Sequence, residues 1–225
     1  MGNGTSVECP AIRLTLRGLD SSTNDSLVPL TRQFVVSRCV KVPGFLDPRL
    51  LAWVQAQVDR ATFHERTHGL IASELCMERN VCLGLLHFLV NDPAVFRFIE
   101  SISGVQPITS FNGRVYRRVP GGQHHDSWHS DVHPDRGVGM SVNLGPTPYA
   151  GGMFEIREED TDPPLGAILN TGPGDAILFA IAEGLEHRVA PLDGIVPKTA
   201  FAGWFGSTRD YVSALRRDPF MTEDV

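Results

Sequence analysis

The spacing of hydrophobic residues changes about halfway along the chain. In the first half, apolar residues recur every three or four positions in two segments, Pro48–Thr62 and Pro93–Ile102. Each segment follows an Asp-Pro pair, in which aspartate can cap a helix and proline suits its first turn. Gly104 is well placed to end the second helix. The pattern predicts two amphipathic helices that serve as packing elements.

From Ser110 onward, the pattern changes to short β-type runs separated by glycine and proline. The runs are Arg114–Val119, Gly139–Leu144, Met153–Arg157, Leu165–Leu169, Asp175–Ala180 and Lys198–Phe205. A further β-branched run, Gln33–Val42, ends at Pro43-Gly44 and predicts an earlier strand. Many short strands preceded by helices predict a mainly β protein with flanking helices, built as a double-stranded β-helix of the jelly-roll or cupin-like type.

The ends of the chain suggest its domain organisation. Residues 1–30 are mostly polar, and only Ile12, Leu14 and Leu16 alternate in a way that predicts one short strand. We therefore expect a flexible N-terminal lead-in over residues 1–30 and one domain over residues 31–225. No internal repeat or low-complexity tract divides that domain.

Composition narrows the possible partners. The 225 residues carry a formal charge of -6 with no Lys/Arg-rich run, which argues against nucleic-acid binding. No apolar run is long enough to cross a bilayer, and Met1–Pro10 lacks the pattern of a secretory signal. The four cysteines have no C-x-x-C spacing, which argues against a zinc ribbon and favours reduced thiols in a cytoplasmic protein. The sequence does not indicate an oligomeric state.

The candidate chemistry begins at Trp128-His129-Ser130-Asp131. Two side chains that are two residues apart on an extended segment point the same way, so His129 and Asp131 could bind one ion. His187 could supply a third ligand from a distant strand, because strands remote in sequence become neighbours in a barrel. Two histidines and one carboxylate are the ligands of a non-haem Fe(II) centre with open positions. An H-x-D pair alone is weak evidence, and His124-His125-Asp126 offers a second one.

Several further motifs occur in an order that resembles the Fe(II)/2-oxoglutarate-dependent dioxygenases, especially their prolyl-4-hydroxylase-like branch. The resemblance covers roughly the last 110 residues. The motifs are Tyr116-x-x-x-Pro120-Gly121-Gly122, Trp128-His129-Ser130-Asp131, Ser141-Val142-Asn143-Leu144, Gly151-Gly152-Met153-Phe154, Pro173 to Phe179, His187-Arg188-Val189-x-Pro191-Leu192 and Lys198-x-x-Phe201-x-x-Trp204-Phe205. Their spacing favours His129 and Asp131 over His124 and Asp126 as metal ligands, and makes Asp126 a loop-capping residue.

The resemblance implies a set of cofactors and roles. Fe(II) would be held by His129, Asp131 and His187, with 2-oxoglutarate and O2 as cosubstrates. Lys198, eleven residues after His187, would pair with the distal carboxylate of 2-oxoglutarate. Tyr116 would hydrogen-bond the same carboxylate, and strand alternation makes Arg118 a second candidate on that face. Related halogenases have a small residue in place of the carboxylate ligand, so the presence of Asp131 favours hydroxylation.

The implied reaction hydroxylates an aliphatic C–H bond of an amino acid, a peptidyl residue or a small metabolite, with release of succinate and CO2. Desaturation, ring closure and epoxidation stay open, since they begin from the same oxidant. Two loops are expected to cover the iron, Phe63–Cys82 and Gln123–Asp135, and Trp204 is expected to be a core aromatic. The competing functions are a cupin-type metal-dependent dioxygenase or isomerase in which Lys198 is dispensable, and a non-catalytic ligand-binding barrel.

Overall fold

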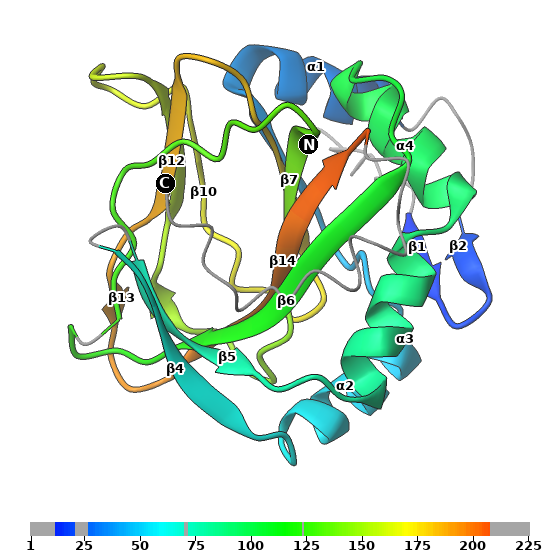
Figure 1. Cartoon of the computed structure of the whole chain (residues 1–225), viewed down its shortest axis with the longest axis vertical. Helices are drawn as coiled ribbons and strands as arrows, with labels where there is room; N and C mark the ends of the chain where they lie inside the picture. Colours follow the sequence, from blue (N-terminus) through cyan, green and yellow to red (C-terminus); the bar gives the residue numbers. More distant parts are fainter. Residues whose placement is uncertain (1–11, 21–26, 70–71, 123, 208–225) are drawn as a thin grey trace, which may run out of the picture.

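The chain folds around two antiparallel sheets that face each other, with helices on the outer side of the larger one (Figure 1). The computed structural model describes residues 12–20, 27–69, 72–122 and 124–207. The larger sheet contains β3 (Cys39–Val42), β4 (Phe63–His68), β5 (Ala72–Met77), β6 (Ser110–Arg118), β7 (Arg136–Asn143), β11 (Ala176–Ala180) and β14 (Lys198–Gly206). Its strand order is β3-β11-β7-β14-β6-β5-β4, so the last described strand lies at its centre.

The smaller sheet and the helices complete the architecture. The smaller sheet contains β9 (Phe154–Glu158), β10 (Gly166–Ile168) and β12 (Leu185–Val189), in the order β10-β9-β12. Two short pairs are β1 (Arg13–Thr15) with β2 (Gly18–Asp20) and β8 (Ala150–Gly151) with β13 (Leu192–Asp193). The helices are α1 (Leu27–Ser37), α2 (Pro48–Val58), α3 (Val81–Val90) and α4 (Pro93–Ser103). The predicted mainly β architecture with flanking helices is confirmed.

The two helices predicted from Asp-Pro signals are present with their caps. The Asp47 side chain accepts hydrogen bonds from the backbone at the start of α2, and Asp92 does the same for α4. Such caps satisfy backbone N–H groups that have no partner within the helix. Gly104 ends α4 with a φ of 73°, a left-handed conformation that glycine adopts without strain. Helix α2 ends at Val58, before the predicted Thr62.

Strand alternation divides the larger sheet into an apolar outer face and a polar inner face. On β6 and β14, the buried side chains of Phe111, Val115, Phe201 and Phe205 belong to the main core with the helices. The intervening positions point the other way because successive strand residues alternate. That inner face carries the Arg118 and Lys198 pair, as well as Asn112, Arg114, Tyr116, Ala200, Ala202 and Trp204. The polar side chains are therefore gathered between the two sheets.

The predicted strand over Gln33–Val42 is only partly correct. Residues up to Ser37 belong to α1, and only Cys39–Val42 forms a strand. Leu30 and Phe34, four positions apart, are buried on one side of α1, while Val35 and Val36 are exposed. Helical burial of that pair overrides the strand preference of the valines. Arg38, with a φ of 56°, separates the two elements.

Two other predictions, for the segment Phe63–Cys82 and for the lead-in over residues 1–30, differ in part from the structure. The segment Phe63–Cys82, predicted as a loop over the iron, forms the β4–β5 hairpin and the beginning of α3. Within the predicted lead-in, the expected short strand is present as β1, and Leu14 is fully buried in the main core. Residues 12–20 are thus packed against the rest of the protein, whereas residues 1–11 and 21–26 lie outside the described part. The domain boundary at residue 31 stays a prediction.

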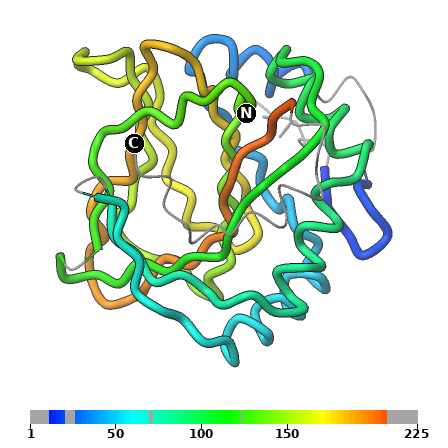
Figure 2. The backbone as a smooth tube through the Cα atoms, viewed as in Figure 1, coloured from blue at the N-terminus to red at the C-terminus, as the bar shows by residue number. Residues whose placement is uncertain are grey.

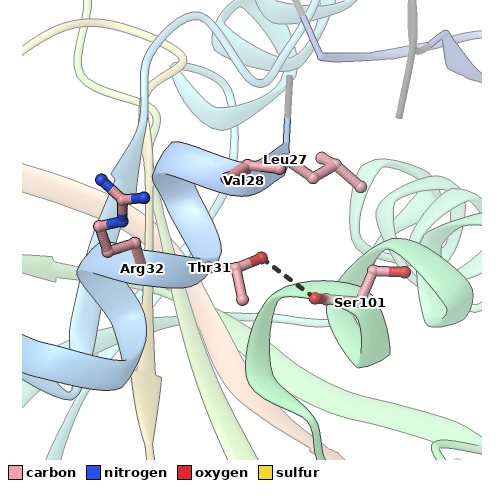
Figure 3. Close-up of a pocket in the computed structure, with 5 residues that line it drawn as sticks. All are labelled: Leu27, Val28, Thr31, Arg32 and Ser101. Atoms are coloured by element: carbon pink, nitrogen blue, oxygen red, sulfur yellow. Dashed lines mark hydrogen bonds between the residues drawn. The ribbon is translucent and has the colours of Figure 1, made fainter. Parts of the chain in front are cut away.

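The helices of the outer layer contact one another directly. The hydroxyl of Thr31 in α1 donates a hydrogen bond to the carbonyl oxygen of Ser101 in α4, beside a surface pocket that Leu27, Val28 and Arg32 also line (Figure 3). No single described helix is long and apolar enough to cross a membrane; α3 and α4 reach that length and composition only together, with a 60° bend between them.

Candidate metal and cosubstrate site

The three predicted metal ligands lie together between the two sheets. His129 and Asp131 belong to the segment that connects β6 with β7, and His187 lies on β12. One ligand atom from each of the three lies within 4.8 Å of the others. Among the residues that the structure describes, this is the one such group of histidine, cysteine and carboxylate side chains. The structure therefore brings the predicted set to one place.

Backbone pairing fixes the two histidines relative to each other. The N–H of His129 donates to the carbonyl oxygen of His187 at 3.1 Å, and the N–H of His187 donates to that of His129 at 2.9 Å. The two residues thus face each other as a bridge at the edge of the smaller sheet. Their rings are 4.4 Å apart between centroids. A metal ion would bind to side chains that the backbone has already aligned.

The ring orientations suit metal binding. His129 Nδ1 lies 2.8 Å from the carbonyl oxygen of Ser127, to which it can donate a proton. Its Nε2 then faces Asp131 Oδ1 at 4.0 Å as a free lone pair, and His187 Nε2 lies 3.3 Å from Asp131 Oδ2. Metal-bound histidines usually donate their second ring nitrogen to a carbonyl or carboxylate in this way. Two imidazole nitrogens and one carboxylate on one side of the ion fit Fe(II) with open positions.

Apolar packing holds His187 in place. The rings of Phe179 and Phe154 lie 4.6 Å and 5.9 Å from the His187 ring between centroids. Gly139, opposite Phe179 on β7, leaves the space that the Phe179 ring occupies, since a Cβ at Gly139 would come within 2.0 Å of that ring. Both phenylalanines belong to the small apolar core between the sheets. That core limits the rotation of His187 and keeps water from one side of the site.

Asp131 has a partner that the sequence interpretation missed. The indole Nε1 of Trp204 donates a hydrogen bond of 2.6 Å to Asp131 Oδ2, so Trp204 does more than fill the core. The guanidinium of Arg136 lies 4.0 Å from the centre of the indole ring. Burial disfavours the charged carboxylate, but His187, His129 and the Trp204 hydrogen bond hold the pKa of Asp131 well below its usual value. The Asp131 carboxylate is therefore ionised at neutral pH, as a metal ligand has to be.

Alternation along β14 could have revealed Trp204. Residues two apart share one face of a strand, which places Trp204 on the same face as Lys198, the predicted cosubstrate residue. The sequence alone does not show which of the neighbouring polar side chains the indole N–H reaches.

The three predicted cosubstrate residues share the inner face of the larger sheet. Lys198 on β14 lies directly opposite Arg118 on β6, and Tyr116 lies two positions farther along the same face. Lys198 is 2% exposed, and its ammonium group lies 5.9 Å from the centre of the Tyr149 ring. Within the described residues, no carboxylate lies within ion-pair distance of Lys198. A buried cation without a counter-charge is costly, which indicates that a bound anion supplies one.

Arg118 differs from Lys198 because it already has carboxylate partners. Its Nη1 lies 2.8 Å from Asp126 Oδ2, and its Nη2 lies 3.8 Å from Glu74 Oε2. Burial alone would lower the pKa of Arg118, but Asp126 and Glu74 raise it above the usual value. Glu74 in turn accepts a hydrogen bond from Arg114 Nε. Arg114, Arg118, Glu74 and Asp126 thus form a buried network with two charges of each sign.

Glu74 allows a test of this network through pH. Its side chain is fully buried; burial opposes ionisation, but Arg114, His68 and Arg118 hold the pKa of the Glu74 carboxyl well below its usual range. A depressed pKa gives stability above the unfolded-state value of about 4.3, and acidification removes it. We expect Glu74→Gln to lower the unfolding free energy by about 3–5 kcal/mol at pH 7, because it leaves buried arginines without their counter-charge. The difference should shrink toward pH 3.

Urea denaturation of the parent and the variant at several pH values measures this difference. The control is Glu65→Gln on the exposed side of the neighbouring strand β4, which should change stability little at any pH. An equal cost of Glu74→Gln at pH 7 and pH 3 would contradict the assignment of an ionised Glu74.

The competing His124-His125-Asp126 motif has other contacts. Val119 donates its backbone N–H to His124 Nδ1 at 2.9 Å. The Asp126 carboxylate, paired with Arg118, also accepts the backbone N–H of Val189 at 2.8 Å. Asp126 is therefore engaged in holding the segment to β6 and β12. This arrangement agrees with the choice of His129 and Asp131 as the metal pair.

The fold has known counterparts, although neither a protein-family model nor a curated protein matches the sequence. A 2OG-Fe(II) oxygenase family oxidoreductase from Burkholderia pseudomallei matches with 18% identity and a TM-score of 0.62, covering 86% of this chain and 95% of that one. A prolyl hydroxylase from Trichoplax adhaerens, solved with a peptide fragment of the hypoxia inducible factor oxygen degradation domain, matches with 14% identity and a TM-score of 0.59, covering 85% and 97%.

A third counterpart is the epimerase SnoN in complex with Fe3+, alpha ketoglutarate and nogalamycin RO. It matches with 15% identity and a TM-score of 0.62, covering 90% of this chain and 93% of that one. The chain therefore has the jelly-roll fold of the Fe(II)/2-oxoglutarate-dependent oxygenases. Prolyl hydroxylases share that fold. The fold implied by the sequence motifs is confirmed.

Proposed function

We propose that the protein is an Fe(II)- and 2-oxoglutarate-dependent dioxygenase. Lys198 supports this proposal most strongly, because it is buried and has no carboxylate partner among the described residues, whereas a metal triad alone would serve many reactions. Lys198 shares the space between the sheets with His129, Asp131 and His187, and a dicarboxylate that binds iron at one end could pair with it at the other. The likeness to oxygenases of this fold, one of them solved with iron and alpha ketoglutarate, supports the same cofactors.

Each residue then has a role. His129, Asp131 and His187 hold the iron, and Trp204 orients Asp131 through its indole N–H. Lys198 pairs with the distal carboxylate of 2-oxoglutarate. On the same inner face, Tyr116 donates a hydrogen bond to that carboxylate, while Arg118 adds positive charge beside it. When bound, the iron with 2-oxoglutarate and O2 supplies an oxidant for a substrate C–H bond and releases succinate and CO2.

The substrate we propose is an amino acid, a peptidyl residue or a small metabolite, and the reaction is hydroxylation of an aliphatic C–H bond. The counterparts support both kinds of substrate, since one was solved with a peptide and another with the small molecule nogalamycin RO. The chain covers 97% of the prolyl hydroxylase and 93% of the epimerase, so the comparison includes nearly the whole of both. An acidic protein with no basic run is a poor match for nucleic acid.

We further propose a cytoplasmic location. The described cysteines Cys39, Cys76 and Cys82 are all buried free thiols. Unpaired cysteines are usual in the reducing cytoplasm and less so in secreted proteins.

The proposal is tested with the purified protein. Anaerobic addition of Fe(II) and 2-oxoglutarate should produce a weak visible charge-transfer band, and admission of O2 should release succinate slowly even without substrate. A screen of amino acids, peptides and metabolites for faster succinate release then identifies the substrate class. Absence of both the band and the succinate would contradict the proposed function.

A further inference from the structure

The segment that carries His129 and Asp131 connects the two sheets. We call residues 124–131 the metal segment; it runs beside β12 in Figure 2. At one point it pairs with the larger sheet, through the bridge between Asp126 and Ala72 of β5. Three residues later it pairs with the smaller sheet, through the bridge between His129 and His187. The metal ligands therefore depend on a short segment that is attached at two ends.

Asp126, in the first half of this segment, contacts two strands and the side chain of His129. Its side chain is 5% exposed. Oδ2 lies 2.8 Å from Arg118 Nη1 on β6 and accepts the N–H of Val189 on β12 at 2.8 Å. Oδ1 lies 3.6 Å from Nδ1 of His129. One buried carboxylate thus contacts the larger sheet, the smaller sheet and the outer nitrogen of a metal ligand.

We propose that Asp126 is a positioning residue for the iron ligand His129, and that Arg118 acts on the metal site through Asp126. The proposal rests on the proposed iron site and extends it to two residues that would not bind the iron themselves. It also gives Arg118 a role that is independent of 2-oxoglutarate. If the proposal is right, substitutions of Asp126 and of Arg118 should both change the metal affinity of the protein when 2-oxoglutarate is absent.

The physical argument concerns orientation and charge. The carbonyl oxygen of Ser127 can accept a hydrogen bond from His129 Nδ1. That carbonyl stays in place only if the metal segment is held on both sides of it. The Asp126 contacts to Arg118 and Val189 hold it. A negative carboxylate beside the outer ring nitrogen also makes the other nitrogen a better metal ligand. Outer partners of this kind typically change metal affinity by 10–100-fold when they are lost.

The test measures Co(II) affinity of the full chain, by titration calorimetry and by the visible absorption of bound Co(II). Asp126→Asn keeps the size of the side chain and an oxygen for the Val189 N–H, but removes the charge that faces Arg118 and His129. We expect it to weaken Co(II) binding about 10–100-fold. The matched control is Asp135→Asn, a carboxylate four residues beyond Asp131 that is 44% exposed, which should bind Co(II) like the parent protein.

A second variant covers the possibility that Asp126→Asn does not fold. Arg118→Lys keeps the buried positive charge but cannot contact Asp126 and Glu74 at once, and it touches no metal ligand. We expect it also to weaken Co(II) binding in the absence of 2-oxoglutarate. Circular dichroism and thermal unfolding of the metal-free proteins measure any general loss of structure separately.

The outcomes distinguish this inference from the proposed function. If the parent protein does not bind Co(II), the iron site itself is wrong. If the parent binds it and a folded Asp126→Asn or Arg118→Lys variant binds it as tightly, the positioning role is overturned. Lower thermal stability with unchanged Co(II) affinity would likewise overturn it, because Asp126 would then only hold the fold together.

Discussion

Replacing Asp131 by alanine should abolish Fe(II)-dependent succinate formation. Asp131 supplies the only carboxylate in the described metal group, and it lies 3.3 Å from His187 Nε2 and 4.0 Å from His129 Nε2. Without it, two imidazole side chains remain, and no carboxylate in the group balances the charge of a divalent cation. A bound metal contributes several kcal/mol to catalysis, so we expect a loss of at least about 10³-fold in turnover.

The measurement is succinate release at saturating Fe(II) and 2-oxoglutarate, together with Co(II) titration of the same protein. Asp135→Ala serves as the control, because Asp135 lies in the same connection between β6 and β7, but its side chain is exposed and its ion-pair partner is His133, which is not one of the proposed metal ligands. Trp204→Phe removes only the hydrogen bond to Asp131 Oδ2 and keeps the carboxylate itself. It should therefore show a smaller loss of metal affinity than Asp131→Ala. Full activity of Asp131→Ala would exclude the proposed metal centre.

Replacing Lys198 by methionine should weaken 2-oxoglutarate binding while it stabilises the protein without cosubstrate. Methionine keeps an unbranched apolar stem of similar length but carries no charge. The bound dicarboxylate would lose its buried partner, at a cost of about 3 kcal/mol or more, which is at least about 10²-fold in affinity. In the free protein, by contrast, the substitution removes a buried cation that has no carboxylate partner in the described part of the chain, and the unfolding free energy should rise.

These opposite changes separate the proposed role from the alternatives. Thermal unfolding with and without 2-oxoglutarate, in the presence of Fe(II) and absence of O2, measures both. The control is Lys41→Met, which removes a lysine that pairs with Asp175 at 2.8 Å and should give no gain in stability. If Lys198→Met binds 2-oxoglutarate as well as the parent and keeps its turnover, a metal-dependent enzyme that uses no 2-oxoglutarate becomes the better hypothesis.

The sequence predicts most of the second half of the fold because its strands are short, alternating and separated by glycine or proline. Each of the six predicted runs from Arg114 to Phe205 overlaps an observed strand, and five of them extend one residue beyond it at one or both ends. The sequence also places His187 on a distant strand, but it does not give the bounds of β12, since Glu186 and Arg188 make that run look polar. In the structure, those two side chains form ion pairs with Arg157 and Glu155 on β9, which is a cross-strand contact that a single segment does not reveal.

The first half was harder to predict because packing decides its structure. In α1, the burial of Leu30 and Phe34 outweighs the strand preference of the valines around them. The β4–β5 hairpin has polar residues on its inner face, among them Glu74, and these resemble a loop until Arg114 and Arg118 are placed beside them. The site shows the same limit: spacing predicts the metal ligands, whereas the partners of Asp126 and Asp131 come from strands distant in the chain.

The position of β14 affects the order in which the molecule can be completed. It is the last described strand, yet it pairs with β6 on one side and β7 on the other. Until it is inserted, the larger sheet is divided into two parts, and neither Lys198 nor Trp204 is in place. During synthesis the ribosome must therefore release this strand before the sheet can close, and contacts between residues so far apart form slowly. A nascent chain that ends before β14 would hold the predicted iron ligands on an unfinished scaffold, without the lysine for the cosubstrate.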